Sequence, residues 1–120
     1  MFLSSCQTAQ KIEEMDEIQM SKESIPWQRE FIVERTLILQ DKEIYERFGF
    51  GEQGFVSATI GTKNGPIAGP LWMWQIDQDG VLTISDSSES KILSLRLNRI
   101  ESELAYTLTE DGKIRVYRIE

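Results

Sequence analysis

Three glycines spaced as Gly49-x-Gly51-x-x-Gly54 are the sequence feature most typical of phosphate chemistry. In a dinucleotide-binding site this spacing follows a strand and begins a helix, whose N-terminus receives the pyrophosphate. Here the next residues, Phe55 to Ile60, alternate in side-chain character as a strand does. Val56 completes the longer glycine-loop pattern of protein kinases, but their His-Arg-Asp loop is excluded because the chain has no histidine. We therefore predict that the glycines form a hairpin turn.

Asp77 and Asp79 precede Gly80 at the alternate spacing that lets carboxylates of a tight turn converge on calcium. The EF-hand pattern also requires a third Asp or Asn before the glycine and a Glu six residues after it. Asp86 stands at that last position instead. We therefore predict an ordinary hairpin turn, with no metal and no other cofactor.

Catalysis by histidine or by paired cysteines is excluded by composition. The chain has 120 residues, no histidine and one cysteine, Cys6, so Ser-His-Asp catalysis, Cys-His catalysis and a thiolate zinc cluster cannot form within it. Two of its 20 acidic residues could serve as an acid and base pair, but nothing in the sequence distinguishes two of them. We therefore expect a protein that is not an enzyme.

The charge balance argues against nucleic acid as a partner. The 20 acidic and 13 basic side chains give a net charge of -7 at pH 7, and no three basic residues follow one another. Phosphate backbones and anionic lipid surfaces are repelled on average by such a surface, whereas a basic protein is attracted.

A set of aromatic residues points most directly to binding. Large flat side chains on strands either fill a small barrel or line a pocket for one small apolar ligand. Core packing is the default interpretation. The alternative is an apolar pocket whose mouth is the segment Gly61 to Pro70, where glycine and proline favour an irregular loop. The set comprises Phe48, Phe50, Trp72, Trp74 and Tyr106.

Short strands would position these side chains, because apolar residues recur at every second position from Trp27 onward. The clearest segment is Ile92 to Asn98. In the next strand, Leu104, Tyr106 and Leu108 are expected to face the core. Asp41 to Arg47 has room for another helical turn. The further expected strands are Phe31 to Leu39 with an interruption at Arg35, Ile44 to Phe50, Val56 to Ile60, Trp72 to Ile76, Val81 to Ser85 and Ile114 to Ile119.

Turn sequences, rather than helix-length segments, separate these runs. Asp79-Gly80 and Asp111-Gly112 tolerate the positive φ of tight hairpins, and such short links join antiparallel neighbours. About eight strands in up-and-down order predict an all-β fold, a small antiparallel meander barrel formed by residues 27–120 as one domain. Closing the barrel would remove exposed strand edges.

Residues 1–25 form a separate polar segment. Lys11 to Ser24 contain residues acceptable to a helix, with Ile12 and Met15 on a narrow apolar face. They predict a short helix or a flexible tether before Pro26, which biases its predecessor away from helix. A docking helix for a partner is the alternative.

The stretch Leu3-Ser4-Ser5-Cys6 resembles the lipobox at which bacterial lipoprotein signal peptides are cut and lipidated. The resemblance implies a lipid anchor at Cys6 and a location in the cell envelope. A secretory leader also needs a charged region and an apolar region of about 7 to 15 residues, so this interpretation requires a longer leader than the three residues before Ser4. A cytoplasmic protein whose cysteine follows two serines by chance is the other interpretation.

Three short segments carry a second resemblance: the stretch from Phe48 to Val56, Trp74-x-Ile76 before an Asp-Gly turn, and Leu82-x-Ile84. Together with the strand order over residues 27–120, they resemble the small lipocalin-like domains of bacterial envelope lipoproteins. The resemblance implies a non-catalytic binding module of the cell envelope that takes a small apolar ligand or a protein partner. The alternative function is that of a small acidic inhibitor or immunity-like protein that neutralises a basic partner.

Overall fold

The computed structural model describes residues 24–120, and nearly all of this part is β-structure. Two strands have the bounds predicted from their alternation, one from Ile44 to Phe50 and one from Ile114 to Ile119. The elements are, in order, α1 (Arg29–Ile32), β1 (Thr36–Leu39), β2 (Ile44–Phe50), β3 (Phe55–Thr62), β4 (Ile67–Ala68), β5 (Leu71–Ile76), β6 (Leu82–Ser85), β7 (Lys91–Glu101), β8 (Leu104–Thr109) and β9 (Ile114–Ile119).

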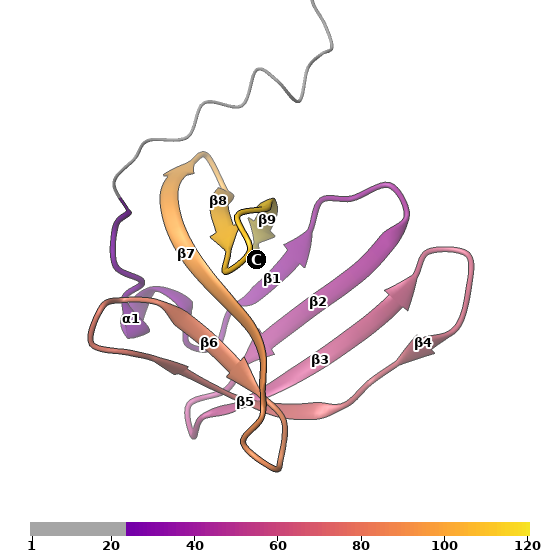
Figure 1. Ribbon diagram of the computed structural model, residues 1–120. Helices are drawn as coiled ribbons and strands as arrows, with labels where there is room; N and C mark the ends of the chain where they lie inside the picture. The colour runs from indigo at the N-terminus through magenta and orange to yellow at the C-terminus, as the bar shows by residue number, and fades with distance from the viewer. Residues whose placement is uncertain (1–23) are drawn as a thin grey trace, which may run out of the picture.

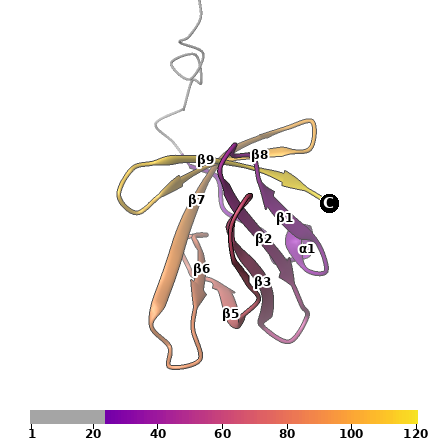
Figure 2. The same cartoon turned by 90° about the vertical axis from the view of Figure 1, so that its right-hand side faces the viewer.

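Eight of the strands form a closed antiparallel barrel. The ring runs through β1, β2, β3, β5, β6, β7, β8 and β9, and β9 pairs with β1 to complete it, with Leu37 opposite Ile119. Figure 1 and Figure 2 show the strands curling around a common interior, with β1, β2 and β3 facing β6 and β7. The predicted all-β meander of about eight strands is confirmed, and the barrel closes.

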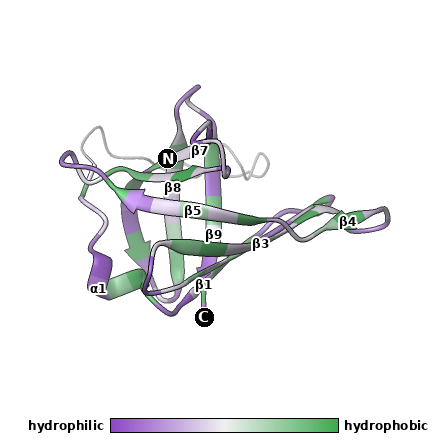
Figure 3. Ribbon diagram, turned by 90° about the horizontal axis from the view of Figure 1, so that it is seen from below, coloured by the Kyte–Doolittle hydropathy of each residue, from purple (hydrophilic) through white to green (hydrophobic). Residues whose placement is uncertain are grey.

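The strands β4 and β5 continue one another along β3. Ile60 lies opposite Ala68 and Ser57 lies opposite Leu71, so both strands keep the same register with β3. The two strands are interrupted at Gly69 and Pro70, because Pro70 has no N–H to donate to the ladder. Together, β3 and β4 form a hairpin that projects from the side of the barrel in Figure 3.

Two expectations about loops are therefore wrong. Most of the segment from Gly61 to Pro70 is hairpin rather than irregular loop, because β3 continues to Thr62 and β4 begins at Ile67. The segment Asp41 to Arg47 holds no helical turn, since β2 begins at Ile44.

The segment containing α1 closes one end of the barrel. Trp27 N–H donates to the Gly80 carbonyl (3.0 Å) and Glu34 N–H to the Phe50 carbonyl (2.6 Å), so the segment crosses from the β5–β6 turn to the β2–β3 turn. Trp27 and Ile32 are buried in the core on the way.

The expected strand at Phe31 and Val33 is consequently wrong. Phe31 lies in α1 and Val33 directly follows it. One helical turn lets Ile32 point into the open barrel end, and this burial outweighs the alternating pattern that predicted a strand.

The core-facing side of β8 is the opposite of the expected one. Ala105 and Thr107 are fully buried, whereas Leu104, Tyr106 and Leu108 are only partly buried. A small residue is required inside because Ala105 lies opposite the buried Tyr117 of β9. Thr107 is accommodated because its hydroxyl donates to the Arg115 carbonyl (2.7 Å).

Residues before α1 also pack against the barrel. Ile25 forms an antiparallel bridge with Leu97 of β7. Gly80 has a φ of +80°, and a Cβ at this position would lie 2.4 Å from the Cβ of Pro26. The β5–β6 turn therefore depends on glycine both for its backbone conformation and for the close approach of Pro26.

Candidate functional site

Three members of the predicted aromatic set lie together in the barrel interior. Phe48 and Phe50 of β2 have ring centroids 6.3 Å apart, and Phe50 meets Trp74 of β5 edge-on at 5.3 Å. All three side chains are at most 5% exposed. Their contacts are those of a packed core, the default interpretation of the set.

The other two members of the set are more exposed than these three. Trp72 is partly buried against the core. Tyr106 is on the outer side of β8, where the Arg99 guanidinium lies over its ring at 4.1 Å. The aromatic residue that joins the interior cluster instead is Tyr117, whose ring is 6.3 Å from that of Phe48.

Tyr117 belongs to a polar cluster that the sequence interpretation did not include. Its hydroxyl donates to Glu46 Oε1 (2.6 Å), and Arg115 Nη1 donates to the same oxygen (2.7 Å). Burial raises the pKa of Tyr117 well above 10.0, and the negative charge of Glu46 raises it further. The tyrosine therefore stays a neutral donor, and the cluster links β2 to β9 through hydrogen bonds and an ion pair.

The two motifs that suggested phosphate and calcium form turns. The glycine motif spans the end of β2 and the following turn, where Gly51 N–H donates to the Phe55 carbonyl (2.8 Å). In the β5–β6 turn, Asp77 Oδ1 accepts hydrogen bonds from the N–H groups of Asp79 (2.8 Å) and Val81 (3.0 Å). Residues 24–120 contain no group of three or more acidic or cysteine side chains arranged to hold a metal ion.

The continuous strand of β4 and β5 has an open edge. Ala58 N–H donates to the Pro70 carbonyl (3.0 Å), so residue 70 directs its backbone groups toward β3. In an antiparallel ladder this direction alternates from one residue to the next. Ile67, Gly69 and Leu71 therefore direct their N–H and C=O groups away from β3.

On that side the neighbouring strand ends too early to pair with these groups. Ser85, the last residue of β6, lies opposite Met73 of β5. Within residues 24–120 no strand lies opposite Ile67, Gly69 or Leu71. Their backbone donors and acceptors are thus available to a partner outside the barrel.

Apolar side chains accompany this edge. Leu71 is 62% exposed and Ile67 is 56% exposed, although both are large and apolar. Phe55, on the neighbouring strand β3 and on the same outer face as Leu71, is 49% exposed. The outward backbone groups and these apolar side chains together form one surface. We call it the β4–β5 edge and define it by Phe55, Ile67, Gly69 and Leu71.

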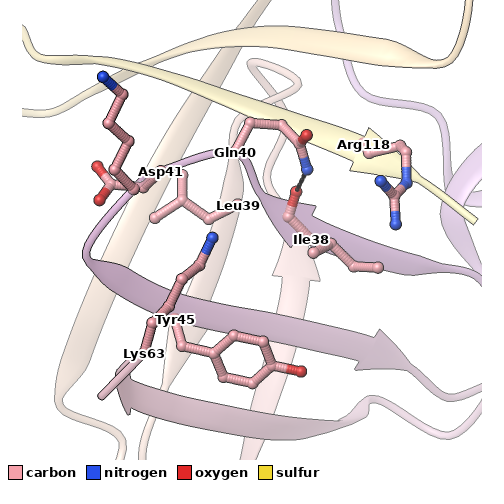
Figure 4. A pocket seen from close by; sticks show the side chains of 8 residues that line it. Ile38, Leu39, Gln40, Asp41, Tyr45, Lys63 and Arg118 are labelled. Atoms are coloured by element: carbon pink, nitrogen blue, oxygen red, sulfur yellow. Dashed lines mark hydrogen bonds between the residues drawn. The ribbon is translucent and has the colours of Figure 1, made fainter. Parts of the chain in front are cut away.

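A groove of about 460 Å³ lies on another part of the surface, beside the turn that joins β1 to β2. Figure 4 shows Lys63 on one side of it and Arg118 on the other, with Ile38 between them. The lining residues are Ile38, Leu39, Gln40, Asp41, Lys42, Tyr45, Lys63 and Arg118.

The electrostatics of this groove depend on Asp41. Asp41 Oδ1 accepts hydrogen bonds from the N–H groups of Ile44 and Glu43, both at 2.8 Å. These bonds lower the pKa of Asp41, and the charge of Lys63 contributes in the same direction. Asp41 is therefore ionised at neutral pH and fixed within its own turn.

In comparisons with known proteins, no family model, no curated protein and no solved structure matches this chain. Within residues 24–120, no helix has the length and hydrophobicity that a membrane-spanning helix requires. The predicted lipid attachment at Cys6 lies outside the described residues, as does the predicted helix or tether up to residue 23.

Proposed function

We propose that this protein is a non-catalytic binding module that captures a protein partner by adding an extended segment of that partner to the β4–β5 edge. The observation that carries the proposal is the set of N–H and C=O groups at Ile67, Gly69 and Leu71, which have no partner strand among residues 24–120. An extended peptide pairs with such groups through main-chain hydrogen bonds, and side-chain contacts provide its specificity.

The side chains at the edge support an apolar partner segment. Leu71, Ile67 and Phe55 would contact side chains on one face of the added strand. Native sheets protect unused edges with charged residues, but residues 64–76 contain none. This segment therefore has the composition of a surface that another chain covers.

The packed interior favours a protein partner over a small apolar ligand. Phe50 contacts both Phe48 and Trp74, and all three side chains are almost completely buried. A ligand in the barrel would have to separate these rings, whereas a strand at the edge displaces only solvent.

A partner of different sequence is favoured over a second copy of the chain. Two copies would each bring a net charge of -7 to the contact. Like charges raise the free energy of association, so a neutral or basic partner segment is preferred.

The lipobox-like stretch before Cys6 supports a location in the cell envelope as part of this proposal. Intact mass measurement of the protein from membrane and soluble fractions of its native host tests it. Acyl mass at Cys6 in the membrane fraction would support the envelope location. An unmodified soluble protein would instead support a cytoplasmic one.

The binding proposal is tested with a library of displayed heptapeptides selected against the full chain. Selected peptides are expected to be apolar at alternate positions and to slow amide hydrogen exchange at Gly69 and Leu71. The substitution Leu71→Pro removes one outward N–H without removing a bond to β3, so it should abolish peptide binding.

Two further variants distinguish binding at the β4–β5 edge from nonspecific hydrophobic binding. Leu71→Lys should weaken peptide binding by adding a charge and removing apolar area at the edge. Ile114→Lys, at an exposed residue on the outer face of β9, should leave binding unchanged. Peptides that bind Leu71→Pro as well as the original chain, or a selection that yields no peptide, would overturn the proposal.

A further inference from the structure

We propose that the groove beside the β1–β2 turn binds an amphipathic anion, a molecule with a carboxylate or phosphate group on an apolar body. The site is separate from the β4–β5 edge, and its argument does not depend on the proposed capture of a protein partner. Its occupant follows from two properties of the lining, an apolar floor and a local excess of positive charge.

The shape and floor of the groove suit a small organic molecule. Its volume of about 460 Å³ is within the range of roughly 300–1,000 Å³ for small-molecule sites. Figure 4 shows Ile38 between the charged ends, with the ring of Tyr45 along one side. The side chains of Ile38 and Tyr45 would contact the apolar body of the ligand, whereas Leu39 faces the barrel core and is 6% exposed.

The charge of the groove is opposite to that of the whole chain. Three cationic side chains, Lys42, Lys63 and Arg118, line it together with one carboxylate, Asp41. The chain as a whole has a net charge of -7. An anion therefore meets a local attraction at this place, although the net charge of the chain repels it on average.

The lysines provide the charges most available to a ligand. Among residues 24–120, neither Lys42 nor Lys63 forms an ion pair with a protein carboxylate. Arg118 is partly engaged, since its Nη2 lies 2.6 Å from Glu120 Oε2. Lys63 N–H donates to the Glu43 carbonyl (2.9 Å), which fixes the backbone of Lys63 beside the β1–β2 turn.

Substitution of Asp41 should change anion binding in the opposite direction to substitution of a groove lysine. Its carboxylate repels an incoming anion, but its structural task is only to accept hydrogen bonds from Glu43 and Ile44. An asparagine can accept the same bonds without the charge. Asp41→Asn should therefore strengthen anion binding, while Lys63→Met should weaken it.

The experiment is an NMR titration of the full chain with octanoate, kept below the concentration at which it forms micelles. Amide shifts are expected at Leu39, Gln40 and Lys63, with an affinity that falls as salt is added. We expect about a two- to fivefold weakening for Lys63→Met and a strengthening of similar size for Asp41→Asn, the range of one partly exposed charge pair.

Matched variants and probes control for nonspecific effects. Lys113→Met and Asp111→Asn change the same residue types in the exposed β8–β9 turn and should leave octanoate binding unchanged. Octyl glucoside tests the apolar body alone, and inorganic phosphate tests the anion alone. Equal binding of either probe would overturn the proposal, as would octanoate binding that Lys63→Met and Asp41→Asn do not change.

A final arm distinguishes a free ligand from a membrane lipid with the same chemistry. Phosphatidylglycerol vesicles present a phosphate on an apolar body at a bilayer surface. Cosedimentation with these vesicles that Lys63→Met reduces would assign the ligand to a membrane. Octanoate binding without cosedimentation would assign it to a free amphipathic anion.

Discussion

The Tyr117 hydroxyl donates a 2.6 Å hydrogen bond to Glu46 Oε1 over a sequence separation of 71 residues. The two residues lie on β9 and β2, which are separated in the sheet by β1. The bond therefore spans the place where the last strand meets the first. Arg115 binds the same oxygen, so one carboxylate holds two groups of β9.

Substitution Tyr117→Phe should lower the free energy of unfolding by about 1–3 kcal/mol, because the partly buried Glu46 carboxylate loses one of its two donors and a hydrogen bond to a charged group contributes about this much. Urea denaturation measures the loss. Tyr45→Phe is the matched control, since its ring is partly exposed, and should change the stability by less than about 0.5 kcal/mol. Equal losses in both variants would contradict a specific role of the Tyr117 hydroxyl.

Gly80→Ala should destabilise the protein more than Gly112→Ala. Both glycines have similar positive φ, +80° and +85°, so alanine adds a comparable backbone cost at each. A Cβ at Gly112 meets nothing within 4 Å, whereas at Gly80 it would lie 2.4 Å from Pro26. Overpacking of this kind adds about 1–3 kcal/mol. Thermal unfolding of the two variants measures the difference in destabilisation. Equal destabilisation would show that Pro26 can move away from the added Cβ without a loss of stability.

Glu34→Gly should stabilise the protein. Glu34 has a φ of 63°, which costs a side-chain-bearing residue about 1–2 kcal/mol, more than the roughly 0.5–1 kcal/mol that glycine loses in freedom. Glu30→Gly, within α1, should have the opposite sign. Denaturant unfolding of both variants checks this reversal, and destabilisation by Glu34→Gly would refute the strain argument.

The gain from Glu34→Gly should also depend on pH. A hydrogen bond with Glu52 and the charge of that residue raise the pKa of Glu34 above 4.5. A raised pKa favours the folded state at low pH, and this contribution is lost as the pH rises through the folded pKa. Removal of Glu34 should therefore stabilise the protein more at pH 7 than at pH 3. A pH-independent gain would assign the whole effect to the backbone.

Three aspartates should make the fold sensitive to acid. Backbone N–H groups of Ile44 and Glu43 lower the pKa of Asp41, and the hydroxyls of Ser88 and Thr109 are the main causes of the lowered pKa values of Asp86 and Asp111. An aspartate whose pKa is lowered in the folded state stabilises the fold at pH values above its unfolded pKa of about 3.8. This stabilisation is lost as the pH falls through the folded pKa. A variant with asparagine at all three positions should lose less stability between pH 5 and pH 2 than the original chain does. Thermal unfolding across that range measures the difference. An unchanged pH profile would show that these aspartates do not cause the acid sensitivity.

The sequence predicted the barrel well because its strands carry local signals. Alternation from Ile44 to Phe50 and from Ile114 to Ile119 gave correct strands, and Asp-Gly turns at Gly80 and Gly112 separate antiparallel neighbours. Closure has no such local signal, because the pairing of Leu37 with Ile119 joins the first strand to the last and requires all the strands between them to be in place.

The errors arose where local pattern did not determine burial. In β8 both faces contain residues that tolerate the interior, and only the facing Tyr117 requires the small Ala105 there. The polar cluster depends on the approach of two distant strands. One signal could have indicated it: Glu46 shares the core-facing positions of Phe48 and Phe50, where a carboxylate requires buried partners.

Closure of the ring also has a consequence during synthesis. Leu37 pairs with Ile119, so β1 lacks its second neighbour until about 80 further residues have been translated. At about 5–20 residues per second this interval lasts roughly 4–16 s. Throughout it the nascent chain exposes a strand edge on the ribosome, and the rate of elongation, rather than the rate of strand pairing, sets how long that edge is open to other nascent chains.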